Sequence, residues 1–391
     1  MDVDRRTPEM DREQPSKNRS YLMKTYGYGH QSIDRSDIDS VCDVLFSDSL
    51  TCGPQVKAFE KAVCDYTGAK YCVAVANGTA ALHIAALAAG LGLGDEAITS
   101  PITFLSSANC ICFCGAKPLF ADIEPDTANI DPTKIEESIT QQTKALIPVH
   151  FGGQSCDMEK ISSIAKKHNL IIIEDAAHAI GSNYKNTKVG SCAYSDMTIF
   201  SFHPVKTITT GEGGAVTTNN PELYAKLCAY RAHGMHKDGD MSNTWEYEMR
   251  ELGFNYRITD FQCALGISQL KKLEAFKQRR REIVAYYNEN LNLPHLTERS
   301  FSNACFHLYP ILINNRKDFY FKARENGLNL QVHYIPVHTQ PYYQKTFGYK
   351  KGDFPNAEAY YGKCISLPLY PELTDEDLAE IVARIKRILA S

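Results

Sequence analysis

The chain has 391 residues, 43% of them hydrophobic, which is enough for a large buried core or for two domains. Its 42 basic and 46 acidic residues give a net charge of −4, so we expect no nucleic-acid or anionic-membrane partner.

Thirteen scattered cysteines, in a chain whose start does not resemble a signal peptide, favour reduced thiols and a cytoplasmic protein. We expect no bound metal, because Cys110, Cys112 and Cys114 lack the paired spacing of a zinc site. No apolar run reaches the roughly 18 residues of a membrane helix, so small-molecule chemistry is the expectation.

The first 20 residues, MDVDRRTPEMDREQPSKNRS, differ in composition from the rest of the chain. They are polar, mixed in charge and almost free of large apolar side chains, so they cannot bury much surface. We therefore predict a disordered tail over residues 1–20. A helical pattern begins at Ile33, and a second helix is expected over residues 56–66 after the turn SLTCGPQ.

Short apolar runs then alternate with longer amphipathic ones. The runs YCVAVA, EAITS, PLFADI, ALIPVHF and LIIIEDAA have the length of buried strands, while AALHIAALAAGLG and MEKISSIAKKHN have the period of helices. This alternation predicts an α/β domain with a mostly parallel sheet and helices on both faces. Ligands of such sheets bind at the carboxyl ends of strands, so the turns after YCVAVA and LIIIEDAA are the places to look for chemistry.

The C-terminal third has a different pattern. A long helical stretch, ALGISQLKKLEAFKQRRREIVAYYNENL, leads to HLYPILI, LNLQVHYIPV and the amphipathic run DEDLAEIVARIKRIL. We predict a large domain over residues 21–262 and a smaller α+β domain over residues 263–391. The basic run at 277–281 could bind phosphate, but a solvated helix face is the preferred interpretation of charges at helical period.

The most informative segment is SDMTIFSFHPVKTITTGEGGAVTTNN, residues 195–220, in which two apolar runs flank a glycine-rich turn that contains Lys206. This is not a phosphate-binding P-loop, because its glycines follow the lysine instead of preceding it. GLGLGDE at 90–96 also fails the spacing of a dinucleotide-binding turn. An ordinary surface lysine beside a hairpin remains the alternative.

A different function of Lys206 is indicated by polar groups at the two expected strand ends. A lysine that binds pyridoxal 5'-phosphate (PLP) needs a carboxylate for the pyridine nitrogen and donors for the phosphate. Asp175 ends the run LIIIED, while Gly78 and Thr79 open a helix after YCVAVAN, where backbone N–H groups can bind an anion. Ser201 adds a hydroxyl five residues before the lysine. The sequence therefore predicts a PLP site.

Several of these motifs together resemble the sugar aminotransferases of the DegT/DnrJ/EryC1/StrS family. The likeness rests on FSFHPVKTITTGEGG, EDAAHA, GFNYR and VHYIP, in this order, and extends from about Tyr28 to Leu389. It implies a fold-type I PLP enzyme. Related dehydratases have histidine in place of the lysine, so Lys206 favours transamination.

The resemblance also implies roles for single residues. Asp175 would contact the pyridine nitrogen, and His178 would lie near the cofactor, although a structural histidine is the competing interpretation. Phe104 would stack on the cofactor ring, for which plain core packing is the alternative. Asn255 would reach the phosphate from the neighbouring subunit of a homodimer. The residues implied for the sugar nucleotide are Tyr28, Asp48, Ser49, Leu50, Thr51, Gln331, Val332, His333 and Tyr334.

The motifs SFHPVK, QVHYIP and ISLPLYP resemble the subgroup that serves pseudaminic acid synthesis. That likeness implies transfer of an amino group from L-glutamate to C4 of a UDP-linked 4-keto-6-deoxy-N-acetylhexosamine. The first alternative is a related enzyme that aminates another keto sugar. A second is a PLP-binding sensor without turnover, but such proteins generally carry a DNA-binding module, and the sequence contains no basic helix-turn-helix pattern.

Overall fold

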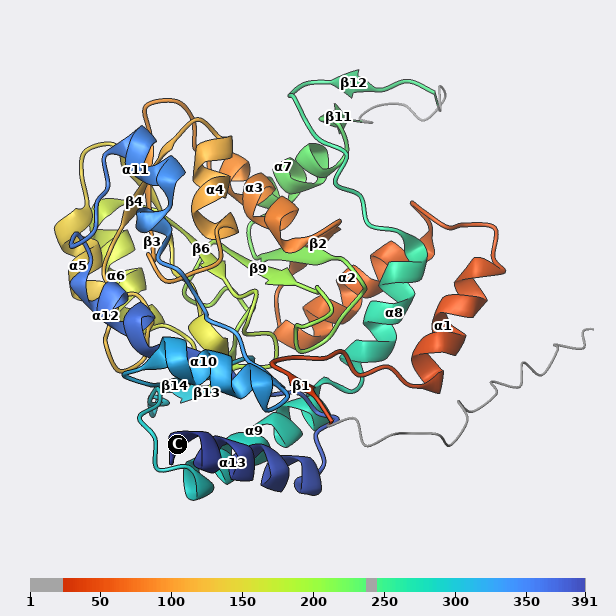
Figure 1. Cartoon of the computed structure of the whole chain (residues 1–391). Coiled ribbons are helices and arrows are strands. Elements are labelled where there is room, and N and C mark those ends of the chain that lie inside the picture. Colours follow the sequence, from red (N-terminus) through yellow and green to blue (C-terminus); the bar gives the residue numbers. More distant parts are fainter. Residues whose placement is uncertain (1–23, 237–244, 391) are drawn as a thin grey trace, which may run out of the picture.

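A computed structural model describes residues 24–236 and 245–390 of the chain (Figure 1). The predicted disordered tail, residues 1–20, lies outside the described residues. A seven-stranded sheet forms the centre, and six of its strands run parallel while β10 runs antiparallel to both of its neighbours. In spatial order the strands are β2 (Tyr71–Val75), β10 (Gly214–Thr218), β9 (Met197–Ser201), β6 (Ile171–Asp175), β5 (Thr143–Ile147), β3 (Glu96–Thr99) and β4 (Lys117–Phe120).

Both faces of this sheet are covered by helices because apolar residues occupy successive positions along each strand. Successive side chains of a strand point to opposite faces, so Val73 and Val75 pack on one side and Cys72 and Ala74 on the other. The first face carries α3 (Gly78–Ala88), α4 (Ser106–Phe113) and α7 (Pro221–Arg231). The second carries α2 (Pro54–Thr67), α5 (Pro132–Ser138), α6 (Met158–His168) and α8 (Asp260–Leu270). The predicted α/β architecture is confirmed.

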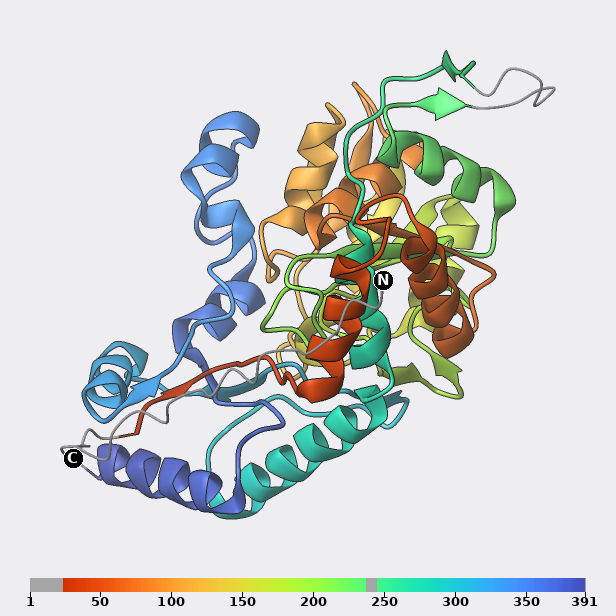
Figure 2. The ribbon, with the colours of Figure 1, turned by 90° about the vertical axis from the view of Figure 1, so that its right-hand side faces the viewer.

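A second, smaller core lies beneath the sheet layer, where α9 and α13 run along the lower edge of the molecule (Figures 1 and 2). The antiparallel pair β14 and β16 packs there with three helices. The N-terminal strand β1 pairs with β15, so the chain enters this core before it builds the sheet. These elements are β1 (Tyr26–Gly27), α9 (Leu273–Asn290), β14 (Tyr309–Leu312), α10 (Arg316–Glu325), β15 (Leu328–Asn329), β16 (Cys364–Leu367) and α13 (Asp375–Leu389).

The expected boundary at residue 262 falls inside α8, which packs against α1 (Arg35–Leu45) and α2. The single long helix expected after residue 264 is two helices, α8 and α9, which meet at Lys271 and Lys272. Each half buries its apolar face in a different core, α8 against the sheet and most of α9 in the smaller core. The division into two domains stays a prediction.

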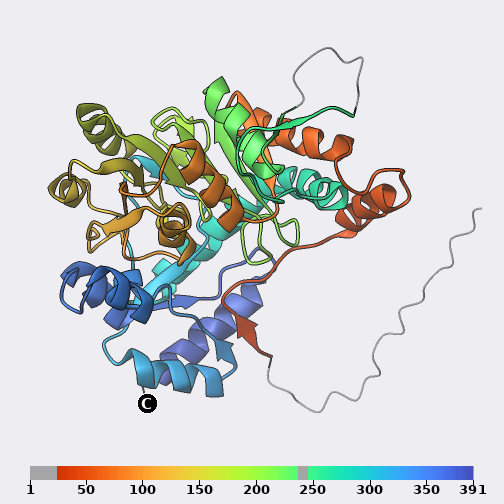
Figure 3. The same cartoon turned by 90° about the horizontal axis from the view of Figure 1, so that it is seen from above.

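The C-terminal part returns to the edge of the sheet through α11 (Pro341–Phe347), which lies beside α4 and β4 (Figures 1 and 3). The next helix, α12 (Pro355–Lys363), packs against the residues that follow β4. Asp122 accepts the first backbone N–H groups of α12, from Asn356 and Ala357, both at 2.9 Å. The remaining strands are β7 (Asn183–Tyr184), β8 (Thr187–Lys188) and β13 (Ser302–Asn303), which form one small sheet, and the projecting hairpin β11 (Met235–His236) and β12 (Glu248–Met249).

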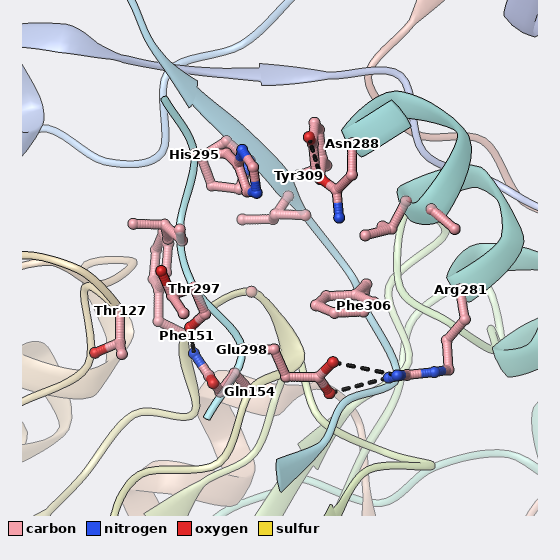
Figure 4. A pocket seen from close by; sticks show the side chains of 16 residues that line it. Thr127, Phe151, Gln154, Arg281, Asn288, His295, Thr297, Glu298, Phe306 and Tyr309 are labelled. Carbon is pink, nitrogen blue, oxygen red and sulfur yellow. Dashed lines mark hydrogen bonds and ion pairs between the residues drawn. The ribbon is translucent and has the colours of Figure 1, made fainter. Parts of the chain in front are cut away.

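The expectation of a solvated face for the basic run 277–281 is wrong for Lys277 and Arg280. Arg280 is 1% exposed and Lys277 is 8% exposed, and both side chains donate to backbone carbonyls. These bonds replace part of the water that a buried cation loses, although Arg280 Nε has no partner among the described residues. Arg281 instead points to Glu298 across a surface cleft of about 260 Å³ between α9 and residues 295–298, with N–O distances of 3.0 and 3.2 Å (Figure 4). Lys277 and Arg280 therefore join the two cores.

All thirteen cysteines lie within the described ranges and carry free thiols. None of the helices in residues 24–236 and 245–390 is long and apolar enough to cross a bilayer.

Candidate active site

The site is built where three parallel strands of the central sheet end, on the two sides of the antiparallel strand β10. Asp175 is the last residue of β6, Ser201 is the last residue of β9, and α3 begins three residues after β2. Asp175 alternates with Ile173, and Ser201 with Ile199, so both polar side chains lie on the face that α3 covers. A cavity of about 880 Å³ opens there, at the carboxyl ends of the strands, as predicted for a ligand site in such a sheet.

One wall of the cavity is the N-terminus of α3. Asn77 caps the helix by accepting the backbone N–H of Ala80 at 2.8 Å. The N–H groups of Gly78 and Thr79 belong to the first turn, where the helix supplies no acceptor, so they can bind an anion. A Cβ atom at Gly78 would lie 2.9 Å from the Cβ of Ser201, so glycine is required for this close approach. The helix N-terminus and the Ser201 hydroxyl therefore face the same small space.

Lys206 reaches the cavity from the loop between β9 and β10. Its backbone N–H donates to His203 at 2.9 Å, but its ammonium group makes no hydrogen bond or ion pair with any residue of the described ranges. Burial lowers the pKa of Lys206 to about 8, against the opposing attraction of the Asp175 carboxylate. An amine without a partner, partly neutral near pH 7, can act as a nucleophile or base.

Asp175 is 4% exposed and lines the same cavity. Its Oδ2 accepts the hydroxyl of Ser107 at 2.6 Å, and its Oδ1 accepts the backbone N–H of Ala177 at 3.1 Å. Burial raises the pKa of the Asp175 carboxyl, while these two bonds and the charge of Lys206 lower it. Each carboxylate oxygen keeps acceptor capacity for a further donor.

His178 is held in one tautomer. Its Nδ1 accepts the backbone N–H of Gly152 at 3.3 Å, so the ring proton is on Nε2, which donates to the hydroxyl oxygen of Tyr334 at 3.1 Å. Burial, which is the larger effect, and the charge of Lys206 together hold the pKa of His178 well below its usual range. Burial also raises the pKa of Tyr334. The pair is therefore neutral near pH 7, and the Tyr334 proton is free to be donated elsewhere.

Most residues that the sequence predicted for the site meet in this cavity. Besides those above, it is lined by Tyr28, Phe104, Gln331, Val332 and His333. The C-terminal loop 331–334 thus lines a site whose other walls include the strand ends and the N-terminus of α3.

Two groups of predicted residues do not line this cavity within one chain. Asn255 is exposed and its backbone forms an isolated bridge with Ala232. In the segment 48–51, Asp48 and Ser49 line a separate depression of about 310 Å³ beside α1 and α8, and Thr51 forms a bridge with Thr259. A single chain does not bring either group to Lys206.

The structure also adds residues that sequence reasoning missed. Ser107 lies at the start of the helix that follows β3, so its position after a strand was an available signal. His307 gave no such signal, because it comes from the loop before β14 in the C-terminal part. Its ring lies 4.5 Å from that of His178 between centroids, and its buried Nδ1 has no partner among the described residues.

The cavity combines an unpaired lysine, a buried carboxylate and an anion site at a helix N-terminus. This donor set fits the amine attachment, the ring nitrogen and the phosphate of PLP, because the close approach of Gly78 to Ser201 places the helix N-terminus and the Ser201 hydroxyl beside each other. The fold and the site define a fold-type I PLP-dependent aminotransferase.

Comparison with known proteins identifies the family. Residues 31–386 match the DegT/DnrJ/EryC1/StrS aminotransferase family, and the chain belongs to it. Members of this family depend on PLP.

Named relatives and a solved structure cover nearly the whole chain. The spore coat polysaccharide biosynthesis protein SpsC of Bacillus subtilis is 42% identical, over 93% of this chain and 96% of that protein. A UDP-4-amino-4,6-dideoxy-N-acetyl-beta-L-altrosamine transaminase of Campylobacter jejuni is 41% identical, over 90% and 94%. The structure of Helicobacter pylori PseC, an aminotransferase involved in the biosynthesis of pseudoaminic acid, superposes with a TM-score of 0.87 at 34% identity, over 94% and 100%. The chain is thus a sugar aminotransferase.

Proposed function

We propose that this enzyme transfers the amino group of L-glutamate to C4 of a UDP-linked 4-keto-6-deoxy-N-acetylhexosamine, for an amino sugar of the pseudaminic acid type. The observation that carries the proposal is the unpaired Lys206 amine in a cavity with Asp175 and the N-terminus of α3. The similarity to the Campylobacter transaminase and to PseC supports this sugar over others.

Lys206 is proposed to hold PLP covalently and then to move protons. When bound, PLP supplies an electron-accepting ring that stabilises negative charge on the carbon next to the transferred nitrogen. Lys206 Nζ takes the Cα proton of glutamate in the first half-reaction and delivers a proton to C4 of the sugar in the second. Its pKa of about 8 suits both directions of transfer at neutral pH.

Other residues that line the same cavity would supply the remaining cofactor contacts. Asp175 would accept a hydrogen bond from the protonated ring nitrogen and keep it charged, while Gly78, Thr79 and Ser201 would bind the phosphate. Phe104, on the loop before α4, lines the cavity and would pack against the ring. His178, neutral and donating to Tyr334, orients that hydroxyl toward the bound ligands.

The sugar nucleotide is proposed to enter between Tyr28 and the loop 331–334, where phenol, imidazole and amide groups suit hexose hydroxyls. A second copy of the chain would supply Asn255 to the phosphate and the segment 48–51 to the substrate. Large apolar side chains are exposed beside both groups, with Phe46 90% exposed and Leu252 75% exposed. Such side chains are costly to leave in water, which supports a shared dimer surface there.

The test is a substrate panel. Purified enzyme with L-glutamate is given each of several UDP-linked 4-keto and 3-keto sugars, and 2-oxoglutarate release is measured. The proposal predicts turnover with the 4-keto-6-deoxy-N-acetylhexosamine and none with the Lys206→Ala control. Faster turnover of another keto sugar would assign a different substrate within the same chemistry. No 2-oxoglutarate with any sugar of the panel would contradict the proposed substrate.

A further inference from the structure

Two consecutive hydrogen bonds between hydroxyl groups link the loop after β3 to the carboxylate of Asp175. Ser107 Oγ lies 2.6 Å from Asp175 Oδ2, and Thr103 Oγ1 lies 2.6 Å from Ser107 Oγ. All three residues are buried, so water does not replace these bonds. None of the roles assigned above uses Ser107 or Thr103.

The donor and acceptor of each of these hydrogen bonds follow from the carboxylate of Asp175. An ionised carboxylate can only accept hydrogen bonds, so Ser107 donates its single hydroxyl proton to Asp175. Ser107 then has none left for Thr103, and the Thr103 hydroxyl must donate to Ser107. Aligned hydroxyls polarise one another, which strengthens the bond at the charged end.

The second carboxylate oxygen is held from another direction. Oδ1 accepts the backbone N–H of Ala177 at 3.1 Å, which leaves Asp175 bound at both oxygens by different segments of the chain. Two such bonds fix the plane of the carboxylate. Removal of the Ser107 hydroxyl leaves Asp175 Oδ2 buried without this partner. The carboxylate can then rotate about its remaining hydrogen bond, from the Ala177 N–H to Oδ1.

We infer that Ser107, itself oriented by Thr103, is a positioning residue that keeps the Asp175 carboxylate ionised and turned toward the ring nitrogen of the cofactor. The inference rests on the role proposed for Asp175. It makes Ser107, which lines the same cavity, part of the cofactor site through its bond to Asp175.

The test uses full-length Lys206→Ala enzyme, in which PLP binds without a covalent link, so that its equilibrium affinity can be measured by absorbance. A second readout, without cofactor, is the pH midpoint of the Asp175 carboxyl carbon in a ¹³C NMR titration, assigned by its loss in Asp175→Asn. Ser107→Ala should weaken PLP binding at least tenfold, which corresponds to about 1.4 kcal/mol. It should also raise the Asp175 midpoint, because the lost bond favoured the charged form.

Matched variants separate positioning from general damage. Ser107→Thr keeps the hydroxyl and should restore both readouts. Ser106→Ala removes the neighbouring hydroxyl, which bonds Thr79 at 2.8 Å, and should weaken PLP binding without moving the Asp175 midpoint. If Ser107→Ala does not fold, Thr103→Val carries the same test, with a smaller upward shift expected.

An unchanged Asp175 midpoint in a folded Ser107→Ala or Thr103→Val variant would overturn the inference. The proposed role of Asp175 has its own control. If Asp175→Asn binds PLP as well as its parent, that role is wrong. If Asp175→Asn weakens binding while Ser107→Ala does not, only the inference about Ser107 fails.

Discussion

The acidity of Lys206 gives the most quantitative prediction. An ordinary lysine has a pKa of 10.5, and burial lowers that of Lys206 to about 8. At pH 7.5 the neutral fraction is then about 24%, compared with about 0.1% for an ordinary lysine, a ratio of roughly 200. Only the neutral amine reacts with an acylating reagent, so in cofactor-free enzyme Lys206 should react far faster than its accessibility would suggest.

The perturbation is Asp175→Asn. The carboxylate favours the charged ammonium, so its removal should lower the Lys206 pKa further, from about 8 to about 7 for the loss of one nearby charge. Brief labelling with acetic anhydride between pH 6 and 10, followed by mass spectrometry of the Lys206 peptide, gives the midpoint, with the exposed Lys166 for normalisation. Glu212→Gln, which removes an exposed carboxylate from the same cavity, should leave the midpoint nearly unchanged.

Two results would refute this reasoning. A Lys206 midpoint above pH 10 in the parent enzyme would mean that the amine is not desolvated by the cavity. A higher midpoint in Asp175→Asn than in the parent would mean that the two groups do not attract each other as the structure indicates.

Three further predictions concern binding and assembly. Lys206→Ala should still bind PLP through its phosphate and ring contacts but show no turnover, and near-normal activity in that variant would exclude Lys206 as the proton carrier. Deletion of residues 1–20 should change activity by less than about twofold, because a polar tail makes few buried contacts; loss of dimerisation would contradict this. Inactive Lys206→Ala and Asn255→Ala chains, when mixed, should regain up to about half of the parent activity, since one site per hybrid dimer is complete. No gain of activity in verified hybrid dimers would mean that Asn255 acts within its own chain.

Much of the site was predictable because local sequence pattern determines strand ends. The runs YCVAVA and LIIIED predict strands, and parallel strands end at one edge, so Gly78, Asp175 and Ser201 had to lie together. Lys206 follows one of these ends by a short turn, which limits how far it can lie from them. The α/β fold follows from the same alternation.

Contacts between distant segments were not predictable. The burial of Arg280 depends on carbonyl groups from residues far along the chain, and helical periodicity alone does not distinguish it from a solvated charge. His307 reaches the cavity only through the packing of the smaller core against the sheet. Asn255 and the segment 48–51 lie away from the cavity of their own chain, so their proposed roles depend on an assembly that one sequence does not describe.

The central claim is that Lys206 carries the cofactor. The most direct measurement is borohydride reduction of the yellow holoenzyme, proteolysis, and mass spectrometry of every lysine peptide. We predict the cofactor mass on the peptide that contains Lys206 alone, because a borohydride-reducible link is proposed for no other lysine. A label on another lysine, or no label on a holoenzyme that turns over glutamate, would contradict the assignment.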